Sequence, residues 1–204
     1  FNQPLDKWNT SNVTDMCNMF MSSIIIPGQS NPTAFNQPLN SWDTSNVTTM
    51  AHMFFGASSF DQPLDEWDTS NVTNMSYMFD TAKVFNHSIN SWNTSNVTQM
   101  TYMFNGTQKF NQPLDQWDTS KVTDMSYMFN NTNAFNQPLD TWNTSNVTTM
   151  AYMFNGAKAF DQPLNSWNTS NVITMTYMFY GTQKFNQPLN KWQTSKVTNM
   201  TAMF

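Results

Sequence analysis

The chain of 204 residues contains no arginine, one cysteine and only 10% charged residues. With a single cysteine, a disulfide framework and a cysteine zinc site are excluded within the chain, and Cys17 is interpreted as an inert small side chain. The balance of 13 acids against 8 lysines, a net charge of -5, argues against nucleic acid as a partner. No stretch approaches the roughly 20 apolar residues that span a bilayer, so no membrane insertion is expected within this segment.

Residues suited to catalysis are equally scarce. His52 and His87 occupy different positions of the repeat described next, and neither has a fixed nucleophile or carboxylate beside it. The five glycines are isolated, so they do not form a phosphate-binding loop. We therefore expect no enzyme activity, no catalytic residue and no cofactor.

The chain consists instead of one motif, FNQPLDKWNTSNVTDMCNMF at its first occurrence, which recurs seven more times. From the second unit onward the period is 25 residues without exception. Such a period is typical of a solenoid, in which each unit buries its apolar face against its neighbours. The units begin at Phe1, Phe35, Phe60, Phe85, Phe110, Phe135, Phe160 and Phe185.

The eight units account for residues 1–204, so we expect a single repeat array without a second domain. The first unit carries an insertion at about residues 21–34, whose Ile24, Ile25 and Ile26 must be covered by the array itself or by a partner. Because the sequence starts in mid-repeat and ends without a polar capping unit, we expect a fragment of a longer protein.

Two short elements are predicted in each unit. Val13, Met16, Met19 and Phe20 have helical spacing, which predicts a short helix or 3₁₀ turn that ends at a left-handed residue, usually glycine. In the other half, a proline allows at most a brief strand, at residues 5–8. The predicted fold class is an α/β repeat solenoid with parallel strands. Full helices would give a strong arc and 3₁₀ turns a straighter superhelix, and the sequence leaves both open.

The consensus FNQPLxxWxTSxVTxMxYMFxG resembles the 25-residue branch of the BspA-like leucine-rich-repeat surface proteins, and the match covers all eight units. The resemblance implies a leucine-rich-repeat-like right-handed superhelix, displayed on the surface of a microbial cell and used for adhesion. It implies no catalytic residues. The chain departs from the family in placing Trp8 and its equivalents where a strand leucine is usual.

Recurring polar residues have structural and functional interpretations. The Thr10–Ser11 pair is present in every unit, which indicates capping and stacking of a turn, with an ice-ordering threonine array as the alternative. Asp and Asn interchange at equivalent positions, such as Asp43 and Asn93. Calcium is therefore a possible but not favoured partner, because a neutral amide serves as well as a carboxylate and turn hydrogen bonds explain both.

Tyrosine supplies the candidate binding residues. It recurs one residue before the second Met, about 100° from that buried side chain on a helix, which predicts an exposed aromatic stripe for protein or sugar recognition. The alternative is that the rings pack on one another between coils. The residues are Tyr77, Tyr102, Tyr127, Tyr152 and Tyr177.

The leading hypothesis is a non-enzymatic, extracellular or cell-surface scaffold for adhesion, which binds a protein or glycan on another cell or matrix through many weak, equivalent contacts. A second hypothesis is a carbohydrate-binding or surface-binding module that uses the tyrosine stripe. A third is a mechanical stalk or spacer without a ligand.

Overall fold

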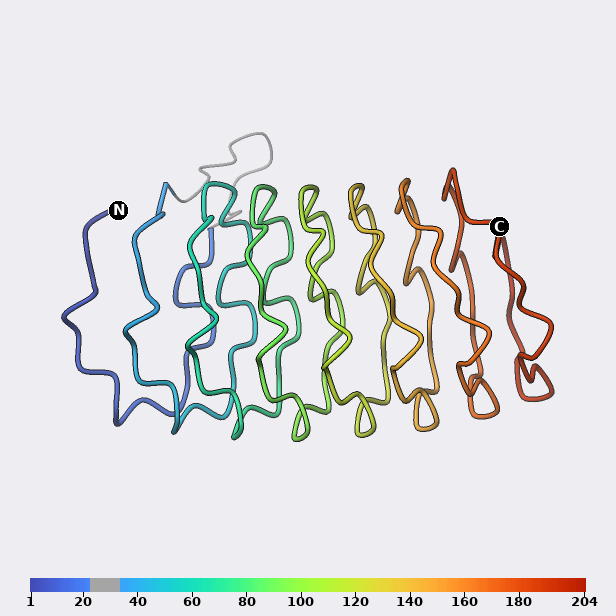
Figure 1. Cartoon of the computed structure of the whole chain (residues 1–204), viewed down its shortest axis with the longest axis horizontal. Coiled ribbons are helices and arrows are strands. Elements are labelled where there is room, and N and C mark those ends of the chain that lie inside the picture. Colours follow the sequence, from blue (N-terminus) through green and yellow to red (C-terminus); the bar gives the residue numbers. More distant parts are fainter. Residues whose placement is uncertain (23–33) are drawn as a thin grey trace.

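The eight units form successive coils that stand side by side in sequence order along one axis, with the termini at opposite ends (Figure 1). This computed structural model describes residues 1–22 and 34–204, and most of the predicted insertion, including Ile24, Ile25 and Ile26, lies outside the described residues. The prediction of a repeat solenoid is confirmed. In the part of the chain described, no helix has the length and apolar character needed to cross a membrane.

The second unit, residues 35–59, shows the path that every coil follows. We call residues 35–39 the side-chain wall, residues 40–46 the lower edge, residues 47–54 the backbone wall and residues 55–59 the upper edge, and use these names for the equivalent residues of every unit. The lower edge contains two tight turns, at residues 40–41 and 45–46. The coil is therefore a flattened loop of two walls joined by two edges (Figure 1).

The predicted helix over residues 13–20 and its equivalents is wrong, because turns occupy this segment in every coil. In the third coil the N–H groups of Met78 and Asp80 bond to carbonyls three residues back, as in tight turns. The N–H groups of Tyr77 and Phe79, which lie between them, bond to the next coil instead. Tyr77 also has a φ of 59°, which interrupts any right-handed helical run. Neither an α-helix nor a 3₁₀ helix can form with this alternation.

The predicted strand over residues 5–8 is also wrong. That segment contains a turn in which the Trp8 N–H donates to the Leu5 carbonyl at 3.0 Å. Parallel pairing occurs on the backbone wall, as isolated bridges with one residue from each coil. The bridges connect Asp15, Thr49, Asn74, Gln99, Asp124, Thr149, Thr174 and Asn199 in that order.

The distance between neighbouring coils differs between the walls. Equivalent rings stack nearly parallel, so the distance between their centroids measures the local separation of the coils. The separation is 4.2–4.8 Å along the tyrosine column of the backbone wall. It is 6.0–6.2 Å along the Phe35 column of the side-chain wall. The array therefore curves, with the backbone wall on its inner side, although residues 1–22 and 34–204 contain no helices.

The core lies between the two walls and is made of the repeated apolar columns. Coils two to seven bury Phe, Leu, Trp, Val and Met side chains to at most 3% exposure. The Phe54 column packs against both the Phe60 and the Trp67 columns, with centroid distances of 4.1 and 6.2 Å. Burial of this kind stabilises each coil by about 1.5–3 kcal/mol for every large side chain, but only while a neighbouring coil is present.

Candidate functional site

The main chain itself joins the coils on the backbone wall. A coil separation below 5 Å matches the distance between paired β-strands, so direct N–H to carbonyl bonds can form. Between the third and fourth coils, five such bonds of 2.6–2.9 Å extend from the backbone wall into the upper edge, and a sixth, from the Lys109 N–H to the Lys83 carbonyl at 3.2 Å, lies on the upper edge. The first five join Thr98 to Thr73, Met75 to Gln99, Tyr77 to Thr101, Phe79 to Met103 and Thr81 to Asn105.

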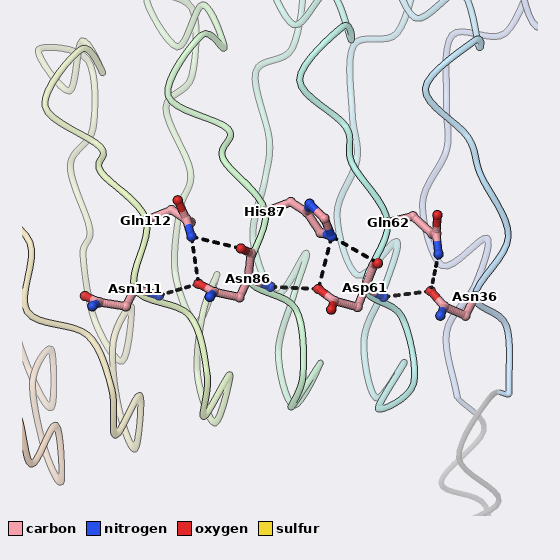
Figure 2. Close-up of polar contacts among 7 residues, drawn as sticks. All are labelled: Asn36, Asp61, Gln62, Asn86, His87, Asn111 and Gln112. Carbon is pink, nitrogen blue, oxygen red and sulfur yellow. Dashed lines mark hydrogen bonds and ion pairs between the residues drawn. The ribbon is translucent and has the colours of Figure 1, made fainter.

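Side chains span the wider gap on the side-chain wall, where a separation of about 6 Å is too large for direct backbone bonds. Figure 2 shows the resulting ladder. The Asn86 Oδ1 accepts from the Asn111 N–H at 2.9 Å and from the Gln112 Nε2 at 3.2 Å. One coil earlier, His87 takes the place of glutamine, with its Nε2 3.4 Å from the Asp61 Oδ1. The recurring Asn-Gln pair is therefore a structural device.

Buried polar side chains of the lower edge add further connections between coils. The Trp117 Nε1 donates to the Ile89 carbonyl of the preceding coil at 3.0 Å. The buried Thr94 hydroxyl donates to the Asp118 carbonyl of the following coil at 3.0 Å. The threonine of the Thr-Ser pair therefore has a structural role.

The interchange of Asp and Asn on the lower edge is explained by turn hydrogen bonds. The Asp43 Oδ1 accepts from the Ser45 N–H at 3.0 Å, and the Asn93 Oδ1 accepts from the Ser95 N–H at 3.1 Å. These bonds from the serine hydroxyl and N–H hold the pKa of Asp43 below its usual range. Within residues 1–22 and 34–204, no three His, Cys, Asp or Glu side chains converge as metal ligands would. The turn interpretation is confirmed, and calcium receives no support.

The predicted tyrosine residues come together as one continuous stack on the backbone wall. His52 begins the stack, with its ring 4.4 Å from that of Tyr77. Each following pair of rings is within 10° of parallel. All the stacked rings are half-buried. Both faces of each interior ring are therefore covered by neighbouring rings, and the interior rings present their edges to solvent.

Stacking changes what the tyrosines can bind. A sugar that packs on an aromatic ring needs a free ring face, which the interior members of the stack lack. Burial, followed by the neighbouring tyrosines, raises the pKa of the Tyr102 hydroxyl, so the hydroxyl stays protonated at physiological pH. The stack therefore offers hydrogen-bonding hydroxyls and ring edges at a regular spacing of 4.2–4.8 Å.

The backbone wall around the stack is polar but almost uncharged. Exposed threonines, such as Thr73 and Thr98, form a column whose hydroxyls donate to the carbonyl of the equivalent residue in the preceding coil at 3.1–3.3 Å, which for Thr198 is Ile173. Asp15 and Asp124 are the only ionisable carboxylates on this wall, and it contains no lysine. These features favour neutral hydrogen-bonding partners.

A short amide ladder on the upper edge ends at a buried acid. The Asn130 Nδ2 donates to the Asn105 Oδ1 at 2.7 Å, and the Asn105 Nδ2 donates to the Asp80 Oδ1 at 2.9 Å. Asp80 is 5% exposed. Burial raises the pKa of this carboxyl to about 7, against the opposing effect of the Asn105 hydrogen bond. The fold thus tolerates Asp80 at a position where the next three coils carry asparagine.

Sequence reasoning located the tyrosine column and gave packing of the rings on one another as one of two interpretations, which the stack confirms, but it missed the backbone conformation. Tyr77, Tyr102, Tyr127, Tyr152 and Tyr177 all have φ between 54° and 60°. Such a conformation is rare for an aromatic residue, so nothing in the residue type signals it. The recurrence of a ring at one position in coils two to seven is the signal from which the stacking was inferred as an alternative.

Comparison with known protein families places the repeat in a described group. The family described as "Mycoplasma protein of unknown function, DUF285" matches residues 1–117 and again residues 103–204. The chain belongs to the DUF285 family. No curated protein and no solved structure showed a significant match. The DUF285 description assigns no function, so functional arguments rest on the geometry of the walls and edges.

Proposed function

We propose that the chain is a non-enzymatic binding scaffold for adhesion, which uses the backbone wall and acts through many weak, equivalent contacts. The supporting observation is that this wall presents a threonine hydroxyl in every coil but the seventh and a tyrosine in the third to seventh coils, on the inner side of a curved array. Curved solenoids commonly bind partners along such a surface. Repetition raises the overall affinity beyond that of one contact.

We further propose that the array is displayed on a cell surface and that its partner is a protein on another cell or matrix. We also propose that the array is a leucine-rich-repeat-like right-handed superhelix. Parallel bridges on the inner side of the curve support the last of these. The similarity of the repeat to BspA-like proteins supports the first.

Adhesion by repetition is tested with arrays of four, six and eight consecutive units, each confirmed as folded by circular dichroism. Beads coated with equal densities of each array are counted on cultured cells and on immobilised matrix proteins. Retention that rises steeply with the number of units supports multivalent binding. Equal retention by all three folded arrays would exclude it.

A neutral glycan is a second candidate partner, because the backbone wall is uncharged over most of its length. Such a glycan would bind through the hydroxyl edges and not by packing on ring faces. Replacing Tyr102, Tyr127 and Tyr152 with Phe keeps the stack and removes three hydroxyls. Unchanged binding to a glycan array would remove the tyrosine hydroxyls from consideration.

A further inference from the structure

Charges are separated between the two edges of the array. On the upper edge the exposed charges are all positive, because its single acid, Asp80, is buried. The lower edge carries eight of the chain's 13 acids, seven of them exposed, against four exposed lysines, so its net charge is negative. The exposed lysines of the upper edge are Lys83, Lys109, Lys158 and Lys184. The acids of the lower edge are Asp6, Asp43, Asp65, Glu66, Asp68, Asp115, Asp118 and Asp140.

No described lysine forms a close ion pair with an acid of its own chain, and only Lys184 and Lys121 are near enough to an acid to lower its pKa, at Asp161 and Asp118. All lysines and all acids lie within residues 1–22 and 34–204, and in that part the single ion pair joins His87 to Asp61. Two lysines at the lower edge, Lys121 and Lys196, donate to asparagine side chains instead. Both edges therefore carry charge that the fold itself does not neutralise.

We propose that the upper edge of one molecule binds the lower edge of a second copy, so that arrays associate side by side. The occupant is a second copy because the two edges carry opposite net charge and run along the same array of coils. The third coil carries Lys83 with Asp65, Glu66 and Asp68, and the sixth carries Lys158 with Asp140. Two arrays in register thus bring opposite charges together at positions three coils apart.

The contact is heterologous, because an upper edge meets a lower edge. After each addition the assembly still has one free upper edge and one free lower edge. Such an interface continues without closing and gives an open ribbon or sheet of arrays. Exposed ion pairs are individually weak, so the association depends on the number of coils engaged. It is also screened by salt, because both edges are exposed to solvent.

Sedimentation velocity on the purified chain tests the proposal at 10–300 μM, in about 20 mM and about 500 mM NaCl, where the Debye length falls from over 20 Å to about 4 Å. We expect the weight-average mass to rise with concentration in low salt and to return to that of the monomer in high salt. A chain that stays monomeric throughout in low salt would overturn the proposal. So would association that salt does not weaken.

Two variants with the same net charge identify the surfaces. Replacing Lys83, Lys109, Lys158 and Lys184 with Gln lowers the net charge from -5 to -9 and is expected to abolish association. Replacing the other four lysines with Gln gives the same net charge but leaves the upper edge intact, and this control is expected to associate at least as well as the parent. Equal weakening by both variants would contradict edge-to-edge binding. Because no other partner is present, failure here leaves the proposed function of the backbone wall untouched.

Discussion

The two walls of the coil use opposite means to hold the array together. On the backbone wall the coils are close, and main-chain bonds join them whatever the side chains are. On the side-chain wall the coils are about 6 Å apart, and its Asn and Gln side chains make the connections, together with Trp side chains of the lower edge that donate to carbonyls of this wall. The curvature therefore determines the type of bond on each wall. Where the coils are close, main-chain groups bond directly, and where the coils are farther apart, only side chains are long enough to connect them.

This difference explains which positions vary among units. The residue at the bridge position of the backbone wall is Asp, Thr, Asn or Gln in different coils, since its main chain makes the bonds. The asparagine of the side-chain wall is replaced only by Asp, which offers the same acceptor, at Asp61 and Asp161. Outward side chains on the backbone wall are therefore available for binding, whereas those of the side-chain wall are committed to the fold.

Replacing a tryptophan should give the largest effect. Trp117→Phe removes the Nε1 donor to the Ile89 carbonyl. Because the Trp117 side chain is only 3% exposed, the smaller ring also leaves a cavity in the core. We expect a loss of about 3 kcal/mol in the free energy of unfolding, measured with urea. The control, Tyr127→Phe on the backbone wall, should cost under about 1 kcal/mol. Equal losses would break the distinction between the walls.

The buried acid of the upper edge should make stability depend on pH. The pKa of Asp80 is raised to about 7 in the folded chain, against about 3.9 when unfolded. The folded state then binds more protons between these values, so stability falls as pH rises from about 4 to about 7. Asp80→Asn should flatten this dependence and stabilise the chain by roughly 2 kcal/mol at pH 8.

Urea unfolding of Asp80→Asn at pH 5 and pH 8 measures this effect. The exposed acid Asp140 provides the control, as Asp140→Asn should leave the parent's pH dependence in place. If the parent chain and the Asp80→Asn chain have the same free energy of unfolding at pH 8, the Asp80 carboxyl carries no unfavourable charge in the folded state.

A single step of the asparagine ladder should contribute a moderate amount. Asn111→Ala removes the acceptor for the Asn136 N–H at 2.9 Å and for the Gln137 Nε2 at 3.0 Å. We expect a loss of about 1 kcal/mol by thermal and urea unfolding. Thr98→Val, the control on the backbone wall, should change stability by less than about 0.5 kcal/mol. Ile173 already occupies the equivalent position in a later coil.

The smallest effect is expected where a β-branched residue is held in a left-handed conformation. Thr81 has a φ of 58° at the position that glycine occupies in four other coils. Thr81→Gly should stabilise the chain by about 0.5–1 kcal/mol, because glycine adopts this conformation without strain. The reverse exchange, Gly106→Thr, serves as the control and should destabilise it. A destabilised Thr81→Gly chain would show that its hydroxyl bond to the Asp80 carbonyl outweighs the strain.

Much of the fold follows from the sequence, and the failures have one physical cause. The repeat, the buried columns and the left-handed glycines such as Gly56 were predicted from residue type and spacing. The spacing of Val13, Met16, Met19 and Phe20, however, suits successive turns as well as a helix. Bonds to the neighbouring coil decided between them, and local sequence does not encode those bonds.

The site was predictable in position but not in form. Tyr102 and its equivalents were identified by recurrence, yet whether their faces or edges meet solvent depends on the coil separation. That separation is set by the main-chain bonds of the backbone wall, and the wider separation opposite it follows from the bulk of the Phe and Trp columns. The ladder of Asn86 and Gln112 was missed because its residues look like ordinary turn formers.

The most direct test of the account compares two chains with four alanines each. One replaces Thr73, Thr98, Thr123 and Thr148 on the backbone wall, and the other replaces Asn36, Asn86, Asn111 and Asn136 on the side-chain wall. Urea unfolding of both should show a loss below about 1 kcal/mol for the threonine chain and about 4 kcal/mol for the asparagine chain. Equal losses, or a larger loss for the threonine chain, would contradict the division between a wall held by its main chain and a wall held by its side chains.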